Sequence, residues 1–320
     1  MKLGFSKGSS DLAFEKIGFG TWGLGGGAYG DISEEIALDL IFYAFRKGIR
    51  LFDTSPLYGS GRSEKILGKA SAELGRERIT VITKAGLFMK GDVEFRDFES
   101  SALKQSVIDS LARLKSEYVD VLLLHSPSIK EIEDGLLENY GLSELIRSKS
   151  IVKFGVSLKS PKDFDFVSSN KRISAIEFNF SLMDQRCEET DIVHTDRRSY
   201  LRIARTPYNF GFLTNTPPPL TPPSRVNNHL GNWPQEQFDR WHSFREVWQE
   251  VANDNNLDIG TLSLAFALSS PFVDAVIPGF MDRKHVDEAV ETCRKGLLNE
   301  ESYILLKNVY LDHTKFHKIN

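Results

Sequence analysis

The sequence predicts a protein of the α/β class, folded as a single closed (β/α)8 TIM barrel with a long lid loop after the seventh strand. The chain has 320 residues, a length that one barrel of this type commonly reaches. Short apolar runs alternate with amphipathic stretches along nearly the whole chain. Most of these runs are apolar throughout, as expected for strands buried on both faces. Such alternation favours a parallel sheet closed into a barrel with its helices outside.

The eight predicted strands are, in order, residues 16–20, 50–53, 79–84, 119–125, 152–157, 175–178, 201–205 and 275–278. Ser33 is a favourable N-cap for a helix through Lys47, whose apolar face would consist of Ile36, Leu40, Ile41, Ala44 and Phe45. Ser63 is expected to begin the next helix, with Glu64 complementing its positive N-terminal end. Further helices are predicted at 101–114, 142–148, 161–168, 238–253 and 259–268. We expect one domain over residues 1–320, with the barrel at about 15–292 and a C-terminal helix and tail at 293–320.

Composition and charge narrow the classes of function. Hydrophobic residues make up 41% and charged residues 26% of the chain, which is ordinary globular usage. The net charge of −4 gives no electrostatic reason to expect a nucleic acid or an anionic membrane as partner. No apolar run approaches the ~20 residues that cross a bilayer, and the N-terminus lacks the apolar core of a secretory signal. Because Cys187 and Cys293 are too few for a disulfide framework, we expect a cytoplasmic protein. Its oligomeric state stays open.

Residues 211–237 interrupt the alternation. They are rich in Pro, Asn and Thr and show neither helical nor strand periodicity. A long loop of this kind within a compact domain is usually a functional lid or a disordered segment. Arg225 and Trp233 within it favour the lid.

Charged or titratable residues stand at or near the ends of the predicted strands. They are Asp53, Lys84, His125, Ser157, Glu177 and Arg205. Because chemistry in such barrels is located at the carboxyl ends of the strands, these side chains are expected to meet at one mouth. Each alone has an ordinary structural explanation, such as capping, packing or extension to solvent. Together, and with Tyr58 on the loop after Asp53, they favour a site.

Four of these residues suit the reduction of a carbonyl group, which needs a proton at oxygen while hydride reaches carbon. A tyrosine hydroxyl is a poor proton source near neutrality, but a buried ammonium beside it lowers its pKa, and a carboxylate holds the ammonium in place. An imidazole next to the oxygen can orient and polarise the carbonyl. Tyr58, Lys84, Asp53 and His125 supply these parts.

From about residue 17 to about residue 291 the chain resembles the aldo-keto reductase superfamily. The resemblance is carried by GFGTWGLGG (18–26), GIRLFDTSPLYGSGRSEKILGKA (48–70), ITVITK (79–84), VDVLLLHSP (119–127), VKFGVS (152–157), IEFNFSLMDQR (176–186), RIARTPYNFGFLT (202–214) and AVIPGF (275–280), in the family's order. It implies that Tyr58 is the general acid/base, that Lys84 and Asp53 tune it, and that His125 orients the carbonyl.

The resemblance also implies a nicotinamide dinucleotide cofactor and no metal. The residues that it assigns to cofactor binding are Gly20, Thr21, Trp22, Ser157, Glu177, Arg205, Pro207, Gly211, Leu213, Gly279, Phe280, Met281, Arg283 and His285. The chain departs from the family pattern at Leu158, Met281 and Ala289, where Asn, a cation and Asn are expected, and at Glu177, where Gln is expected. Arg205 stands where the family places a residue that stacks on the nicotinamide. The nearby Arg283, Lys284 and His285 are positive enough to hold a 2′-phosphate, so NADP(H) is favoured over NAD(H).

A small-molecule carbonyl substrate is expected at the same mouth. The predicted pocket residues are Trp22, Tyr29, Leu57, Phe88, Ser126, Arg225 and Trp233. Aromatic side chains mixed with Arg225, Asn227 and Asn228 favour a polar carbonyl compound such as a sugar or sugar derivative.

Two alternatives remain open at this point. The first is a cofactor-binding regulatory or redox-sensing barrel without significant turnover. The second is an aldolase-like barrel that uses Lys84 as a Schiff-base nucleophile. Two motifs do not indicate the sites that they resemble. The G-x-G-x-x-G at 18–23 is followed by more loop instead of a helix, so it is not a Rossmann phosphate-binding loop, and His313 and His317 lack the third ligand of a metal site.

Overall fold

The computed structural model describes residues 2–90, 93–134, 140–168, 170–194, 200–225 and 228–314, and it contains a parallel eight-stranded barrel. The strands are β1 Gly18–Gly20, β2 Leu51–Asp53, β3 Thr80–Ala85, β6 Val119–His125, β7 Ile151–Ser157, β8 Ala175–Asn179, β9 Leu201–Arg205 and β10 Ala275–Ile277, paired in that order. Parallel bridges between Ile17 and Val276 and between Gly20 and Gly279 join the last strand to the first. The predicted (β/α)8 barrel is confirmed, and every predicted strand overlaps an observed one.

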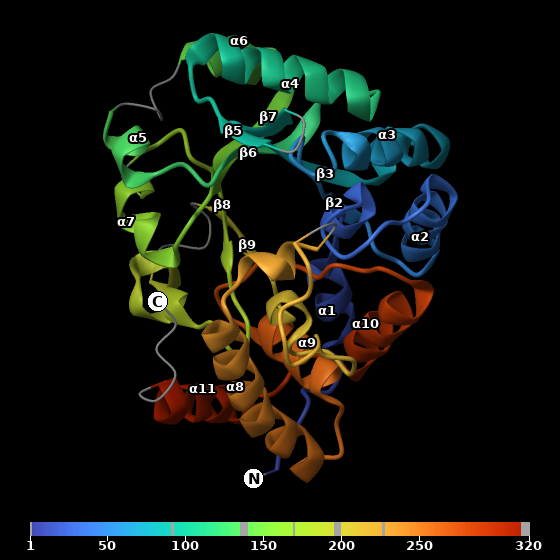
Figure 1. Cartoon of the computed structure of the whole chain (residues 1–320), viewed down its shortest axis with the longest axis vertical. Coiled ribbons are helices and arrows are strands. Elements are labelled where there is room, and N and C mark those ends of the chain that lie inside the picture. Colours follow the sequence, from blue (N-terminus) through green and yellow to red (C-terminus); the bar gives the residue numbers. More distant parts are fainter. Residues whose placement is uncertain are drawn as a thin grey trace.

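Helices surround the strands (Figure 1). They are α2 Glu34–Arg46, α3 Arg62–Leu74, α4 Ser100–Leu114, α5 Ile129–Glu133, α6 Ser143–Arg147, α7 Phe164–Val167, α8 Gln235–Asp254, α9 Ile259–Ser269 and α10 Arg283–Lys295. Two further helices, α1 Ser10–Lys16 and α11 Glu300–Thr314, precede the first strand and follow α10, and α11 packs against α9. Within the described ranges, no helix is both long and apolar enough to cross a membrane.

The alternation of side chains along the strands places the chemical groups inside the barrel. The barrel interior is filled by a small apolar cluster that includes Ile82, Leu123, Ala175 and Ile203, with Leu51 packed against it. Residues two positions apart on a strand point to the same face. The next inward-facing positions are therefore Asp53, Lys84, His125, Glu177 and Arg205. A larger apolar cluster fills the space between the sheet and the helices.

The first two long helices show where local prediction was wrong. The Ser33 hydroxyl accepts a hydrogen bond from the Ile36 amide as predicted, but the Ile36 side chain is 53% exposed, because the buried face of the helix is centred on Ala37, Ile41 and Ala44 and Ile36 lies outside it. Helix α3 begins at Arg62, after Gly61 with φ +82°, so Ser63 is not its N-cap. Glu64 lies in the first turn of α3 as predicted. It is also fully buried and accepts hydrogen bonds from Thr83 Oγ1 and Arg113 Nε at 2.6 Å each, so it forms an internal ion pair as well.

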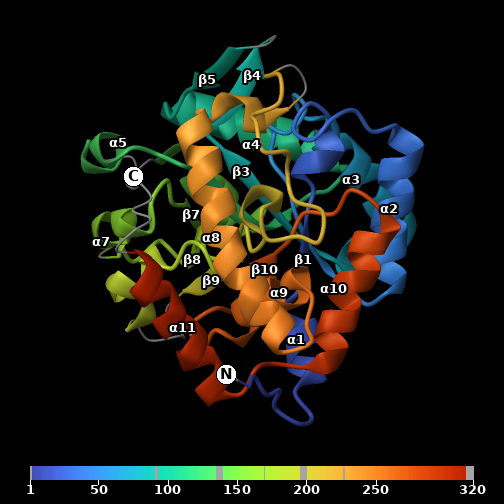
Figure 2. The same cartoon turned by 60° about the horizontal axis from the view of Figure 1, so that its bottom comes forward.

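Two loop regions contain structure that the sequence did not indicate. After β3 the chain forms an antiparallel hairpin, β4 Leu87–Lys90 and β5 Val93–Arg96, which is visible at the top of Figure 2. Residues 211–237 were predicted to be irregular, but they include a 3-10 turn at His229–Asn232 and the start of α8. The His229 amide and its Nδ1 both lie 3.0 Å from the Ala28 carbonyl, which attaches this segment to the loop after β1. A lid role for it stays a prediction.

Candidate active site

A buried lysine forms the centre of the cluster at the carboxyl ends of the strands. Lys84 is 1% exposed, and its Nζ donates to Asp53 Oδ1 and, at 3.2 Å, to the Thr54 carbonyl. The same nitrogen lies 3.3 Å from the Tyr58 hydroxyl. The predicted group of Asp53, Tyr58 and Lys84 is therefore assembled around one ammonium.

The loop that carries Tyr58 is fixed by backbone and hydroxyl contacts. The Ser63 amide donates to the Tyr58 carbonyl at 3.3 Å, and the Ser63 hydroxyl lies 2.5 Å from Thr21 Oγ1 and 3.0 Å from Thr54 Oγ1. Gly59 has φ +59°, and a Cβ there would overlap the carbonyl of Gly25. Only glycine allows the loops after β1 and β2 to approach this closely, and their contact holds the tyrosine in place.

His125 occupies the other side of Tyr58, with ring centroids 6.3 Å apart. Burial drives the pKa of His125 well below its usual value, and the Lys84 charge adds to this shift, so the imidazole is neutral near pH 7. Its Nδ1 lies 3.2 Å from the Ser55 hydroxyl. Sequence reasoning did not single out Ser55, although a hydroxyl between the predicted Asp53 and Tyr58 was a usable signal.

The electrostatics of Tyr58 differ from the prediction. Burial raises the pKa of its hydroxyl above the ordinary value, and the Lys84 ammonium opposes this only in part because Asp53 and Glu177 add negative charge. The expected lowering is therefore wrong for this site as it stands. Burial also raises the pKa of Asp53 to about 7 against the opposing Lys84 charge. Although burial acts in the opposite direction, the carboxylates of Asp53 and Glu177 raise the pKa of Lys84, which stays an ammonium.

Glu177 and Arg205 extend the cluster across the barrel. Glu177 is fully buried, and its Oε1 lies 3.7 Å from Lys84 Nζ while its Oε2 lies 3.9 Å from Arg205 Nε. Arg205 donates to the Leu158 carbonyl at 3.2 Å. The neighbouring Ser157 is buried and aligns with His125 and Glu177 in the sheet register. The buried oxygens of Glu177 lack hydrogen-bond partners among the described residues, so they suit an amide donor such as that of a nicotinamide.

The loops predicted to hold the rest of a dinucleotide lie next to one another. Gly20 donates to the Pro278 carbonyl at 2.8 Å, which joins the loop after β1 to the loop after β10. A Cβ on Gly23 would overlap Met281 Sδ, so Met281 packs against the first loop. Two of the other predicted residues make hydrogen bonds within the protein: Thr21 donates to the Asp53 carbonyl, and the Pro207 carbonyl accepts from Ser263. Gly279 is bridged to Gly20, and Gly211 has φ +97°. The side chains of Leu213, Phe280 and Ala289 are buried. Leu213 and Phe280 therefore present almost no surface to a cofactor in this structure.

The three basic residues predicted to hold a 2′-phosphate contact protein groups. Arg283 Nε donates to Asp39 at 2.7 Å. Lys284 Nζ lies 3.7 Å from Glu288, and His285 Nδ1 accepts from the Met281 amide at 3.3 Å. A phosphate here would have to compete with these contacts.

An aromatic wall stands beside Tyr58. Trp22 lies 6.1 Å from the Tyr58 ring, 5.6 Å from Tyr29 and 4.4 Å from His229, measured between centroids. His229 was not predicted, because nothing in the sequence indicates that its loop returns to the loop after β1. Trp233 lies further along the row, 5.9 Å from Phe210.

The other predicted pocket residues are distributed around the mouth. Leu57 donates its amide to Ser55, and Phe88 stacks on Phe95 in the hairpin, whose Arg96 donates to the Ser126 carbonyl at 3.1 Å. Arg225 is exposed and donates to the Gly231 carbonyl of its own loop. Asn228 forms a bridge to Tyr29, whereas Asn227 and His317 lie outside the described residues.

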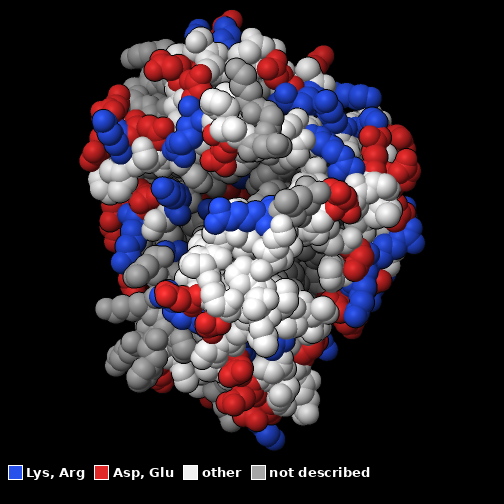
Figure 3. All heavy atoms as spheres, in the orientation of Figure 1, with Lys and Arg blue, Asp and Glu red and all other residues white. Residues whose placement is uncertain are grey.

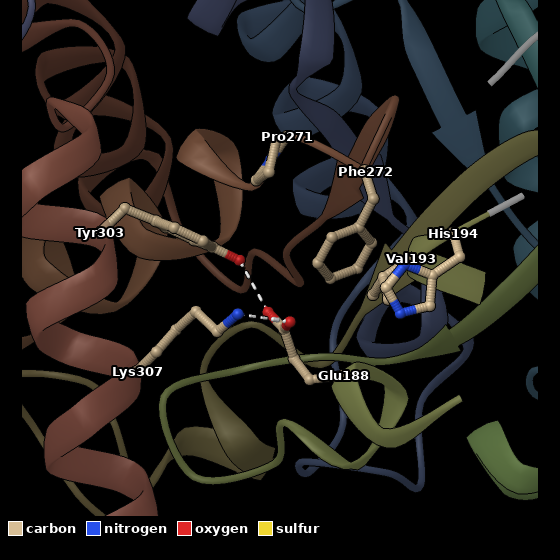
Figure 4. A pocket seen from close by; sticks show the side chains of 7 residues that line it. All are labelled: Glu188, Val193, His194, Pro271, Phe272, Tyr303 and Lys307. Carbon is tan, nitrogen blue, oxygen red and sulfur yellow. Dashed lines mark hydrogen bonds and ion pairs between the residues drawn. The ribbon is translucent and has the colours of Figure 1, made fainter. Parts of the chain in front are cut away.

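Two surface hollows lie elsewhere on the molecule, and each contains ion pairs between protein side chains. One of about 270 Å³ is lined by Glu188, Val193, His194, Pro271, Phe272, Tyr303 and Lys307. In it Tyr303 and Lys307 both donate to Glu188, at 3.0 and 2.7 Å (Figure 4). The other is lined by residues of α3 and α4 and by Glu34, and in it Lys69 pairs with Glu34 and Arg113 with Glu64. Figure 3 shows Lys and Arg side chains gathered on the side of the molecule where α3 lies. In the part of the chain that the structure describes, no group of three or more His, Cys, Asp and Glu residues is arranged to hold a metal ion.

The mouth of the barrel thus brings together a tyrosine hydroxyl, a buried lysine–carboxylate pair and a neutral imidazole, the groups that the sequence predicts for an enzyme acting on a carbonyl. A model of the Aldo/keto reductase family matches residues 16–310, so the chain belongs to this family and is an NAD(P)-dependent oxidoreductase.

Individual relatives agree with this assignment. The NADH-specific methylglyoxal reductase of Escherichia coli (strain K12) is 27% identical over 312 residues, covering 93% of this chain and 95% of the relative. The L-galactose dehydrogenase of Arabidopsis thaliana is 28% identical over 292 residues, covering 88% and 85%. The holo form of an aldo-keto reductase from Bacillus halodurans has the same fold, with a TM-score of 0.76 at 23% identity over 92% of this chain and 91% of that one.

Proposed function

We propose that the protein reduces an aldehyde or ketone to the alcohol with NAD(P)H, and that Tyr58 is the general acid. The observation that carries this proposal is that two groups meet at Tyr58: Lys84 Nζ lies 3.3 Å from its hydroxyl, and the His125 ring lies edge-on to its ring with centroids 6.3 Å apart.

When bound, the reduced nicotinamide supplies the hydride that adds to the carbonyl carbon, and its ring becomes a pyridinium. Tyr58, protonated because its pKa is raised, donates its proton to the carbonyl oxygen. Lys84 stabilises the phenolate that results, and solvent returns the proton. The Ser55 hydroxyl lies 3.2 Å from His125 Nδ1, and the proposal assigns it as the donor, so that the imidazole carries its proton on Nε2 and can hold the carbonyl oxygen with it.

The two alternatives predict different chemistry. A Schiff-base nucleophile must be a neutral amine, whereas the carboxylates around Lys84 raise its pKa and keep it protonated. This argues against the aldolase-like reading. A regulatory barrel without turnover would keep the same cluster, and only a measurement of turnover separates it from the enzyme.

A polar substrate suits the mouth. The wall of Trp22 and Tyr29 offers an aromatic face, and the Nε2 of His229 is buried without a hydrogen-bond partner among the described residues. Burial lowers the pKa of His229, so this nitrogen is uncharged. We propose a short polar carbonyl compound or a sugar, in line with the methylglyoxal and L-galactose named for two relatives. We propose NADP(H) as the preferred cofactor, because Arg283, Lys284 and His285 can hold a 2′-phosphate once Arg283 breaks its hydrogen bond to Asp39. We also propose that the protein is cytoplasmic and that its chain forms one domain.

The test is turnover by Tyr58→Phe, with Tyr43→Phe as matched control. Tyr43 donates its hydroxyl to Asp287 on the outer surface of the barrel, so the control removes an equivalent group away from the mouth. With methylglyoxal and a panel of aldoses, Tyr58→Phe should lose about 10³-fold or more in kcat while NAD(P)H affinity stays unchanged. Retained turnover would exclude Tyr58 as the acid, and absence of turnover in the unmodified protein on every carbonyl tested would support the regulatory reading.

A further inference from the structure

The carboxylate of Glu177 is the most unusual charge in the structure. Its side chain is 0% exposed, and both of its oxygens lack a hydrogen-bond partner among the described residues. The cations near it, Lys84 at 3.7 Å and Arg205 at 3.9 Å, are at ion-pair distance and beyond hydrogen-bond distance. A carboxylate buried in this way persists only because those charges compensate it.

The compensation is shared among four groups from four strands. Asp53 on β2, Lys84 on β3, Glu177 on β8 and Arg205 on β9 alternate between acidic and basic side chains, each at ion-pair distance from the next. Lys84 is already hydrogen-bonded to Asp53, so Arg205 is the second cation that compensates Glu177. The remaining groups of the mouth, Tyr58 and neutral His125, add no charge near pH 7.

Both charges lie close to where the nicotinamide ring must bind if the proposed function is right. Hydride transfer needs the ring carbon at ~3–3.5 Å from the carbonyl carbon whose oxygen contacts Tyr58. Lys84 Nζ is 3.3 Å from Tyr58 OH and 3.7 Å from Glu177 Oε1, so the carboxylate and the hydroxyl are at most about 7 Å apart. The ring therefore falls within the field of Glu177. It is neutral when reduced and carries one positive charge when oxidised.

We propose that Glu177 and Arg205 form a charge pair that sets the relative affinity of the site for oxidised and reduced nicotinamide. The carboxylate stabilises the pyridinium, and the guanidinium opposes it by a similar amount. The inference rests on the proposed function, since it needs the dinucleotide at this mouth. It concerns binding, so its test does not depend on turnover.

The experiment measures Kd for NAD⁺, NADH, NADP⁺ and NADPH in the full-length protein by tryptophan-fluorescence titration, for the unmodified protein, Glu177→Gln, Arg205→Met and the double variant. Glu177→Gln should raise the ratio of Kd for the oxidised to Kd for the reduced form at least tenfold, about 1.4 kcal/mol. Arg205→Met should lower the ratio by a similar factor. The double variant should return to within about threefold of the unmodified protein, because the two charges cancel.

Glu177→Asp is the matched control, since it keeps the charge and changes the contacts. Its ratio should stay within about threefold of the unmodified value, even if both affinities fall. Equal changes in the two Kd values of Glu177→Gln would overturn the proposal and assign Glu177 to the cofactor amide alone. If turnover depends on Tyr58 while the ratio does not depend on charge, only this inference fails. If no dinucleotide binds the unmodified protein, both fail.

Discussion

Replacing Asp53 with Asn should make the protein more stable at alkaline pH while reducing its activity. Asp53 is 4% exposed, and its pKa rises from 3.8 to about 7 on folding because burial outweighs the attraction of Lys84. A carboxyl whose pKa is raised in the folded state stabilises the fold below its unfolded pKa, and this contribution is lost as the pH rises through the folded pKa. At about 1.4 kcal/mol per unit of pKa shift, the full loss is on the order of 4 kcal/mol, and it develops between about pH 4 and pH 7.

The assay is urea unfolding, followed by circular dichroism, of the unmodified protein and Asp53→Asn at several pH values. The free energy of unfolding of Asp53→Asn should increase relative to that of the unmodified protein as the pH rises. The slope m of this free energy against urea concentration should be the same for both proteins. Glu177 remains 3.7 Å from Lys84, so the ammonium keeps a counter-ion and the variant can fold. A difference that shifts in favour of the unmodified protein with rising pH would refute the reasoning, since it would mean that the attraction of Lys84 outweighs burial and holds the pKa of Asp53 below its ordinary value. At pH 7 we expect a drop in kcat, because Lys84 loses the partner that positions it.

Two further predictions concern ion pairs. Asp39→Asn frees Arg283 and should strengthen binding of NADPH relative to NADH by about threefold to fivefold in a fluorescence titration; equal effects on both dinucleotides would argue against a 2′-phosphate site at Arg283. Glu64→Ala removes the buried partner of Arg113 and should cost about 3 kcal/mol in urea unfolding, whereas Glu34→Ala, which breaks an exposed pair, should cost ~1 kcal/mol or less. Similar losses in these two variants would mean that burial does not set the strength of the Glu64 pair.

The fold and most of the inward-facing site could be predicted because they depend on local patterns. Runs buried on both faces marked the strands, and a charge that interrupts such a run marked its carboxyl end. Asp53, Lys84 and His125 were recognised in this way, and the structure places all three beside Tyr58. The period of two along a strand then fixes which side chains share the interior.

Predictions that depended on a distant partner were less secure. The pKa of Tyr58 was expected to fall because one neighbour, Lys84, was considered, whereas burial and the carboxylates of Asp53 and Glu177 reverse the direction. Ile36 was assigned to the buried face by spacing alone and is exposed.

The sequence by itself determined the barrel, its strand order and the identity of the groups at its mouth, since these follow from hydrophobic periodicity and from residues adjacent in the chain. Only the tertiary structure decided that His229 reaches Trp22 and that Arg283 pairs with Asp39, across about 200 residues or more in each case. The physical reason is that the energy of a charge or a polar group depends on every group around it in space. The local sequence does not show which distant residues become neighbours in the folded protein.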